Sequence, residues 1–378
     1  MHSLSIRIAI VAALAFPALA HAQGNVSTLG FGYPAGLLST RALGSGGSIG
    51  EIDPLSVSNP AAIGAFGGSI VYFQAEPEYR TLHVGSATEK TSIARYPLIA
   101  ASIPITPSFM LGLSATNLLD RSFQTSGRGQ QTIADSTIGT TNSFKSDGAI
   151  ADVRLALGWT ALSWLKVGAA AHAITGDNRV RNTQVFDDSA RFARLIDTAT
   201  VGYTGSALSA GFEAIALQSW SIAGSYRRGG GLSLRRGDTT LARANVPDRV
   251  AGSVAYLGIR GSSIAVRTAK DSWSRMQSLG SPNLHITDGW DTSLGADMLG
   301  PRIGERNLQL RAGARRRTLP FGTSVTSVSE TSYSLGAGTS FSRGRSSVDV
   351  AGIRTLRAAG PNLSESAFTL SIGLTVRP

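Results

Sequence analysis

Apolar and polar residues alternate with a period of two along much of the chain. In the last segment, 368–376, every second residue is apolar and most of the residues between are small or polar. The same alternation runs through 151–160, 165–173 and 308–315. Successive side chains of a strand point to opposite faces, so these segments are predicted to be strands with one apolar face and one polar face.

The connections between the expected strands alternate between short and long. Short links recur at residues 104–107, 162–163, 217–218, 258–261, 300–304 and 343–344. Long polar links lie at residues 85–91, 125–147, 176–194, 229–246, 270–289, 320–330 and 357–365. An outer-membrane barrel has short turns at one end and long loops at the other, whereas a sandwich has no reason to sort its loops. We therefore predict an all-β fold, a transmembrane antiparallel β-barrel of about fourteen strands over residues 67–378.

The composition points to an exported membrane protein. The chain has no Cys, which excludes disulfides and Cys-ligated metal centres, and only 16% of its residues are charged. Residues 1–22 have the pattern of a secretory signal peptide, with Arg7 before an apolar run and small residues at the expected cleavage site. We predict that the mature chain lies in the bacterial cell outer membrane with both termini in the periplasm.

Residues 23–66 do not alternate. They are rich in Gly, Ser, Pro and Asn, and they precede the first expected strand. Irregular backbone is tolerated at membrane depth only where it is buried in protein or lines a water-filled cavity. We therefore predict that this segment is a hatch, or plug, inside the barrel; the alternative is a disordered periplasmic tail.

Two motifs lie in this segment, T-R-A-L-G-S-G-G at residues 40–47 and the triplet Asn59, Pro60 and Ala61. They resemble the hatch of the FadL-type family of outer-membrane transporters for long-chain fatty acids and aromatic hydrocarbons, and residues 310–338 look like late strands of that family. The resemblance implies a fourteen-stranded barrel with an N-terminal hatch, passive uptake of hydrophobic molecules, and the barrel-assembly machinery as a partner during biogenesis.

The chain is basic, with a formal net charge of +11 at pH 7. A charged side chain that faces lipid near the midplane of the membrane destabilises the barrel by roughly 2–4 kcal/mol. Basic residues on the face opposite the apolar one should therefore point into the lumen. They form a ligand path for an anionic head group, or they pair with lumenal carboxylates and fix the hatch. These candidates are Arg154, Lys166, His172, Arg311 and Arg315. The arginine-rich segments 227–228, 235–236 and 315–317 are candidates to bind outer-membrane lipid and lipopolysaccharide phosphates at the rim.

No enzyme, metal site or cofactor is predicted. Beyond the signal segment the histidines are His83, His172 and His285, each isolated, and carboxylates do not cluster at metal-ligand spacing. Residues 46–50 match G-x-S-x-G formally, but a nucleophile elbow needs a strand before it and a helix after it. A serine, a histidine and a carboxylate brought together in space would revive the enzyme class. Export also argues against a nucleic-acid partner.

The leading hypothesis is an outer-membrane barrel for passive uptake of a hydrophobic small-molecule ligand, such as a long-chain fatty acid or a hydrocarbon. The alternative is a structural or partner-binding outer-membrane barrel, for example one associated with a secretion system, with no transport of its own. An apolar lumen pocket beneath the hatch would favour transport. A polar, fully plugged lumen would favour the alternative.

Overall fold

The computed structural model describes residues 25–378 apart from 86, 134–135, 281–283, 304–305, 323–326, 343 and 361–362. The predicted signal peptide, residues 1–22, lies outside the described residues. No helix in the described part of the chain is both long enough and apolar enough to cross a membrane.

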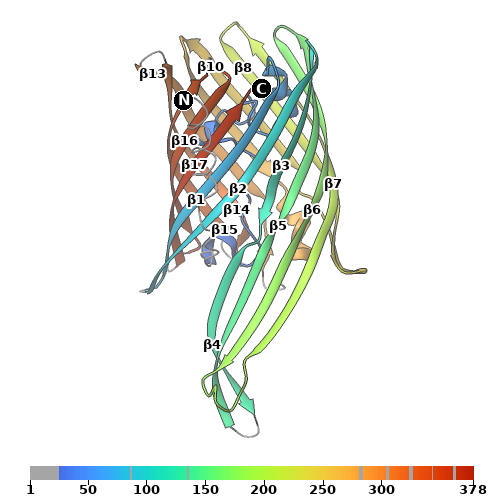
Figure 1. The fold of residues 1–378 in the computed structure, drawn as a ribbon, viewed down its shortest axis with the longest axis vertical. Coiled ribbons are helices and arrows are strands. Elements are labelled where there is room, and N and C mark those ends of the chain that lie inside the picture. Colours follow the sequence, from blue (N-terminus) through green and yellow to red (C-terminus); the bar gives the residue numbers. More distant parts are fainter. Residues whose placement is uncertain are drawn as a thin grey trace, which may run out of the picture.

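The described residues form one antiparallel sheet of 17 strands, of which 14 close into a barrel (Figure 1). The barrel strands are β1 (Ile70–Val84), β2 (Ala87–Thr106), β3 (Phe109–Asp120), β5 (Ser136–Leu162), β6 (Leu165–Phe186), β7 (Leu195–Ala216), β8 (Trp220–Arg236), β10 (Arg249–Ile259), β11 (Ser262–Asp271), β13 (Gly289–Ile303), β14 (Arg306–Gly322), β15 (Ser327–Phe341), β16 (Ser346–Ala358) and β17 (Leu363–Val376). The ring closes because β1 pairs with both β2 and β17. The predicted all-β barrel of about fourteen strands is confirmed.

The two ends of the barrel differ. At one end, the turn end, the hairpins are tight and β17 finishes beside the start of β1. Leu217 and Gln218 form one of these tight turns with φ angles of 47° and 61°, the left-handed conformation that two-residue hairpins use. At the other end, the projecting end, β5, β6 and β7 extend well beyond the ring (Figure 1).

Much of the sequence predicted as long polar links is strand instead. Residues 125–147 lie largely in β4 (Phe123–Ile133) and the first half of β5, and residues 229–246 lie largely in β8 and β9 (Thr239–Asn245). A short strand, β12 (His285–Ile286), pairs with β14. The prediction failed here because strands that project past the lipid need no apolar face, so their sequence is as polar as a loop.

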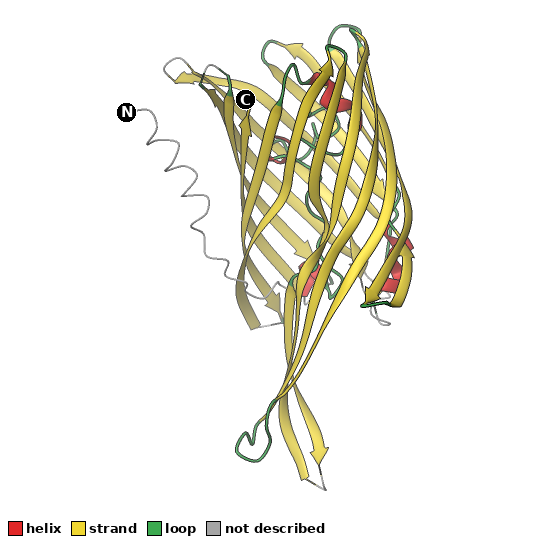
Figure 2. Cartoon of the chain, turned by 45° about the vertical axis from the view of Figure 1, so that its right-hand side comes forward, coloured by secondary structure: helices red, strands yellow, loops and turns green. Residues whose placement is uncertain are grey.

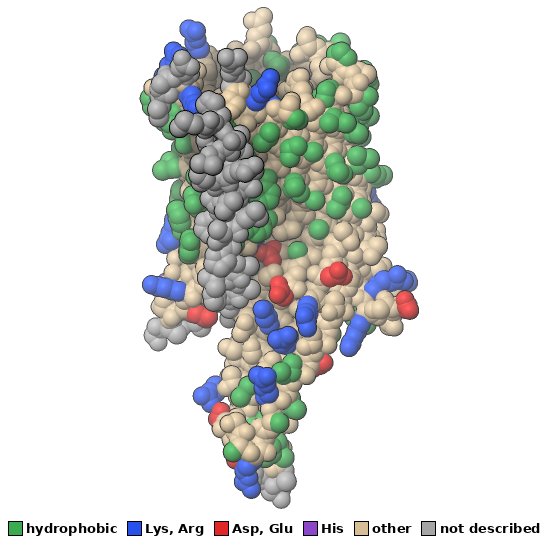
Figure 3. Space-filling model, in the orientation of Figure 1, with side chains coloured by type: hydrophobic (Ala, Val, Ile, Leu, Met, Phe, Trp, Pro, Cys, Tyr) green, Lys and Arg blue, Asp and Glu red, His purple; other side chains and the backbone are tan. Residues whose placement is uncertain are grey.

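The outer wall of the ring is apolar. Large hydrophobic side chains are exposed along it, among them Leu335 at 71% and Leu208 at 66%. Figure 3 shows hydrophobic side chains spread over the wall, with many charged side chains toward the two ends. Near the turn end Trp159, Trp164 and Trp220 are exposed, where an interfacial aromatic girdle is expected. This wall matches the surface that a membrane-spanning barrel presents to lipid.

The described residues before β1, from residue 25 on, run through the inside of the ring (Figures 1 and 2). They contain the short helices α2 (Asn25–Thr28), α3 (Thr40–Gly44) and η1 (Pro60–Ala65). A further 3-10 helix, η2 (Trp273–Leu279), lies in the link between β11 and β13. We call residues 25–66 the hatch.

Glycines in the wall let the hatch backbone lie directly against it. A Cβ added at Gly295 would come within 2.0 Å of the Ser45 carbonyl oxygen, and one at Gly313 within 2.2 Å of the Ser45 carbonyl carbon. Similarly, a Cβ at Gly211 would lie 2.1 Å from Asn59 Oδ1. Because real Cβ atoms do not approach this closely, a larger residue at these positions would push the hatch off the wall.

Candidate functional site

The Asn59, Pro60 and Ala61 triplet caps a helix and ties it to the wall. Asn59 is fully buried, and its Oδ1 accepts a hydrogen bond of 3.0 Å from the Ala61 amide at the start of η1. Its Nδ2 donates to the carbonyl oxygens of Glu51, at 2.9 Å, and of Phe212 on β7, at 3.0 Å. Pro60 takes the first helical position, where a missing N–H costs no hydrogen bond. The motif is therefore a helix cap that also anchors the hatch.

A buried ion pair holds the middle of the hatch. Glu51 accepts from Arg267 Nε on β11 at 3.1 Å, and both side chains are completely buried. Arg267 also donates to Asp291 on β13 at 3.0 Å, while Ser225 on β8 donates to Glu51 at 2.7 Å. Burial alone would raise the pKa of Glu51, but the charges of Arg267 and Arg249 outweigh it and lower that pKa. Glu51 is therefore held as a carboxylate.

Two of the predicted path residues, Arg311 and Arg315, point inward from β14. Arg311 donates to Asp297 at 3.1 Å and to Asp349 at 2.6 Å. Arg315 makes a two-pronged contact with Asp291, at 2.7 and 2.8 Å. The accepting carboxylates lie on β13, next to β14, and on β16, beyond β15, so these guanidiniums brace the wall.

Arg154 and Lys166 also face the interior. Arg154 Nη1 on β5 donates to the Val57 carbonyl of the hatch at 2.5 Å. Lys166 on β6 pairs with Glu213 on β7 at 3.1 Å. Of these two, only Arg154 holds the hatch directly. Among the described residues, fully buried carboxylates outnumber fully buried arginines, so the basic excess of the chain lies at exposed positions.

The last predicted path residue, His172, sits in a chain of hydrogen bonds across three strands. Its Nδ1 lies 2.8 Å from Asp152 Oδ1 on β5, and its Nε2 lies 2.8 Å from Ser209 Oγ on β7. Serine hydrolases use the same order of groups, but their hydroxyl faces a substrate. Ser209 is only 9% exposed, and Gly211, two residues on, lies against Asn59 of the hatch. We interpret the chain as a structural link that fixes the imidazole.

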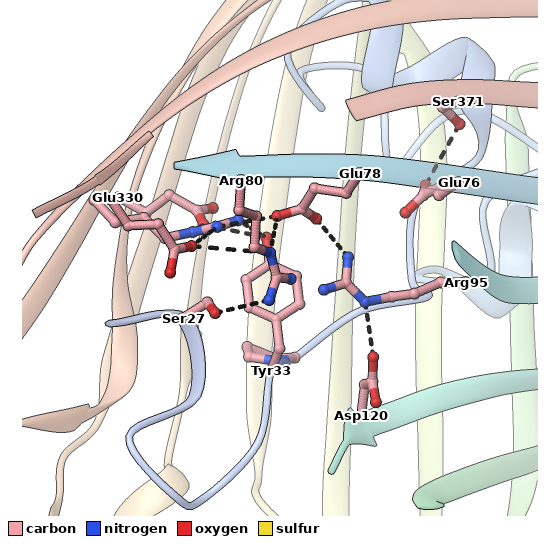
Figure 4. A network of polar contacts seen from close by, with 12 residues as sticks. Ser27, Tyr33, Glu76, Glu78, Arg80, Arg95, Asp120, Glu330 and Ser371 are labelled. Atoms are coloured by element: carbon pink, nitrogen blue, oxygen red, sulfur yellow. Dashed lines mark hydrogen bonds and ion pairs between the residues drawn. The ribbon is translucent and has the colours of Figure 1, made fainter. Parts of the chain in front are cut away.

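A cluster around Tyr33 was not found by sequence reasoning (Figure 4). The guanidiniums of Arg95, Arg317 and Arg357 lie over its ring, at 4.7, 4.8 and 4.9 Å from the centroid. The Tyr33 hydroxyl lies 3.1 Å from Glu330 Oε2 and accepts from Arg357 at 3.1 Å. We call these five residues the Tyr33 cluster. It joins the start of the hatch to β2, β14, β15 and β16.

Glu78 on β1 extends the Tyr33 cluster around the inner wall of the barrel. It pairs with Arg80 at 2.7 Å, with Arg95 at 2.5 Å and with Arg357 at 3.0 Å, and Arg95 also pairs with Asp120 at 2.8 Å. The only signal in the sequence is the alternation of Glu76, Glu78 and Arg80. Their partners are distant in the chain, so the sequence does not identify the network.

The hatch separates two spaces. A cavity of about 100 Å³, the hatch cavity, lies on the side of Leu43 and is lined by arginines of the wall together with Trp273 and Tyr33. A vestibule of about 1150 Å³ lies on the side of Arg41 and reaches the C-terminal residues at the turn end. Leu43 and Arg41 both belong to α3, so this helix is the partition between the two spaces.

The lumen is apolar toward the projecting end. A large cluster of buried hydrophobic residues joins the hatch, the strand ends and η2 there. Its larger members are Val26, Phe31, Leu82, Leu118, Leu119, Ile150, Ile174, Tyr203, Leu232, Val246, Trp273, Met276, Leu279, Leu284, Ile286, Leu319, Phe321 and Val328. Water-filled barrels have polar interiors, so this apolar cluster sets the lumen apart from an open porin channel.

Comparison with protein-family models finds no match, and comparison with curated proteins finds none either. Solved structures do match. A Pseudomonas aeruginosa FadL homologue aligns with a TM-score of 0.66 and 13% identity over 92% of this chain and 99% of that chain. The P. putida toluene transporter TodX aligns with a TM-score of 0.57 and 14% identity over 94% of this chain and 99% of that one. The CymD monoaromatic hydrocarbon channel aligns with a TM-score of 0.56 and 14% identity over 94% and 99%.

These matches establish the architecture. The chain has the fold of the FadL-type channels, and the predicted resemblance to that family is confirmed at the level of the fold. None of the three neighbours is described as an enzyme, in line with the expectation for this chain. Within the described residues no group of three or more His, Asp or Glu is placed to hold a metal ion.

The first prediction concerns the buried pair in the hatch. Replacing Glu51 with Gln leaves Arg267 with Asp291 as its remaining carboxylate partner, so we expect the docked hatch to lose about 1.5–3 kcal/mol, the value of a hydrogen bond to a charged group. Hydrogen exchange should quicken over residues 39–59 and stay unchanged in the barrel strands. Glu89→Gln, at an exposed position on β2, is the matched control and should leave exchange unaltered.

The same pair makes the docked hatch sensitive to acid. The pKa of Glu51 is lowered, so its contribution is present above the unfolded value of 4.5 and is lost as pH falls through the folded value. After correction for the intrinsic pH dependence of amide exchange, protection of the hatch should therefore fall on acidification more in the wild type than in Glu51→Gln. Equal acid sensitivity of the two proteins would contradict this assignment.

A second prediction concerns the Asp152, His172 and Ser209 chain. Because the hydroxyl is buried and serves structure, a fluorophosphonate probe for serine hydrolases should leave the folded barrel unlabelled, while a known hydrolase in the same tube reacts. Labelling that disappears in Ser209→Ala would show that this serine is an activated nucleophile.

Proposed function

We propose that this protein is an outer-membrane barrel for passive uptake of hydrophobic small molecules. The observation that carries the proposal is the apolar cluster inside the projecting end of the lumen. A water-filled channel for polar solutes would have a polar interior, whereas a hydrophobic solute gains free energy by leaving water for an apolar one. The neighbours with this fold include a toluene transporter and a monoaromatic hydrocarbon channel, which supports the same class of ligand.

The proposal fixes an orientation. The turn end faces the periplasm, which places both chain ends of the mature protein there, and the projecting end faces the medium. This orientation agrees with the usual placement of short turns and long loops in outer-membrane barrels. A ligand then meets the apolar cluster first, passes α3 and leaves by way of the vestibule or through the wall.

Neutral ligands fit the site better than the anionic ones that the basic residues suggested. Arg311, Arg315 and Lys166 are paired with carboxylates, so they offer a head group little unmatched charge. An aromatic or aliphatic hydrocarbon needs no such partner. Within the proposed class we therefore favour hydrocarbons over long-chain fatty acids.

One observation favours the alternative, a barrel that binds a protein partner and does not transport. Strands β5, β6 and β7 project far beyond the ring together with β4 (Figure 1), and one edge of β4 has no paired strand within the described residues. Exposed strand edges are templates for pairing with another chain. The ion-paired lumen at the level of the hatch is also compatible with this role.

Uptake of toluene into vesicles with an outer leaflet of lipopolysaccharide, which slows its passage through the lipid itself, separates the two roles when vesicles without the barrel serve as the baseline. Met276 lies fully buried in the apolar cluster but on η2, outside the barrel strands, so Met276→Glu should block the route without unfolding the ring. We expect toluene uptake to fall about tenfold, because a buried charge repels an apolar solute. Met276→Leu, which keeps an apolar side chain of similar size at the same position, is the control and should transport like the wild type. Uptake by Met276→Glu at the wild-type rate, or none by wild-type barrels, would reject transport through this cluster.

A further inference from the structure

Two basic side chains on the outside of the wall differ from those in the lumen. Arg354 on β16 and Lys90 on β2 are exposed, and they have no ion-pair partner among the described residues. Arg228, another exposed cation toward the projecting end, is paired with Asp248 at 2.8 Å. An unpaired cation on a membrane-facing wall calls for a partner from outside the chain.

Both cations line one groove on the outer surface. The groove has a volume of about 540 Å³, and Tyr79, Phe368 and hydroxyl side chains line it as well. Phe368 lies directly across from Arg354 on one side and from Tyr79 on the other, and the two rings are 45% and 59% exposed. Lys90 faces Thr81 in the same register. The groove is thus lined by the aromatic rings of Tyr79 and Phe368, with one cation on each side of them.

Two hydroxyls share the outer face with the cations. Thr81 lies across from Lys90, and Ser92 lies across from Tyr79. A phosphate oxygen can accept from these hydroxyls as well as from the two cations.

The depth of the groove suits a lipid head group. Arg354 is eight residues from Ser346, where β16 begins at the turn end. A rise of ~3.3 Å per residue and a strand tilt of ~40° place it roughly 20 Å along the barrel axis. The apolar band of such barrels is ~25 Å tall, so Arg354 lies near the interface on the projecting side. Aromatic residues and snorkelling cations belong at this level.

We propose that this groove binds a phosphate of lipopolysaccharide, the phosphorylated glycolipid of the outer leaflet. Arg354 offers a planar fork of donors to the phosphate, Lys90 adds a second charge, and Tyr79 and Phe368 pack against the acyl chains. The inference rests on the outer-membrane orientation proposed above, in which the projecting end is outside, but it does not depend on transport.

Native mass spectrometry of the purified barrel with added lipopolysaccharide tests the site. The double variant Arg354→Ala, Lys90→Ala should bind about tenfold more weakly, the loss expected for charge-assisted hydrogen bonds. Wild type should show a similar loss with lipopolysaccharide whose phosphates have been removed by phosphatase. The control, Arg260→Ala with Arg306→Ala, removes two exposed cations at the turn end and should bind normally.

Three outcomes would overturn the proposal. The first is that the double variant binds lipopolysaccharide like the wild type. The second is that the control variant loses as much lipopolysaccharide binding as the double variant. The third is that phosphatidylglycerol binds as tightly as lipopolysaccharide and depends equally on the two cations. The last result would assign the groove to anionic phospholipids. Heat-modifiable migration on gels verifies folding, and Arg354→Gln replaces the double variant if that protein does not fold. Because the measurement is lipid binding, its result is independent of whether the barrel transports.

Discussion

The structure depends on the rule that a charge buried inside the barrel must find an opposite charge or a hydrogen-bond partner there. Glu51 and Arg267 show the rule most directly, because both side chains are completely buried and each is the other's partner. Isolated, either ion would be very costly to bury. The hatch therefore supplies a carboxylate that the wall needs, and the wall supplies a guanidinium that the hatch needs. The Tyr33 cluster repeats this dependence near the start of the hatch.

These ion pairs divide the lumen into parts with different chemistry. The projecting end is apolar, the level of the hatch is ion-paired, and the vestibule lies open at the turn end. A cavity of about 100 Å³ beside α3 is smaller than the ~300–1,000 Å³ of most small-molecule sites. A ligand that accumulates in the apolar cluster therefore cannot reach the vestibule while α3 stays in place. Transport through this route requires the hatch to shift.

Most barrel strands, and the face to which each side chain points, could be predicted from the sequence. The alternation of apolar and polar residues is a local property that each strand carries by itself. Parity placed Arg311 and Arg315 in the lumen, yet their partners lie on other strands, and pairing depends on a register that parity does not give. The contacts of Tyr72 on β1 are equally non-local, because it points inward, where the Thr40 amide of the hatch donates to its hydroxyl. The polar strands of the projecting end were predicted as loops. They have no apolar face, so the alternation by which a strand is predicted from sequence is missing there.

A disulfide between hatch and wall tests the account most directly. Thr40 Oγ1 lies 2.8 Å from Ser371 Oγ on β17, so cysteines at both positions are close enough to join, and the chain has no other Cys to compete. The measurement is barrel-dependent toluene uptake, above that of protein-free vesicles, by vesicles with a lipopolysaccharide outer leaflet that carry Thr40→Cys, Ser371→Cys, before and after reduction. Our account predicts that uptake is lost in the oxidised barrel and restored by reductant. Equal uptake in both states would show that hydrophobic solutes cross without movement of the hatch.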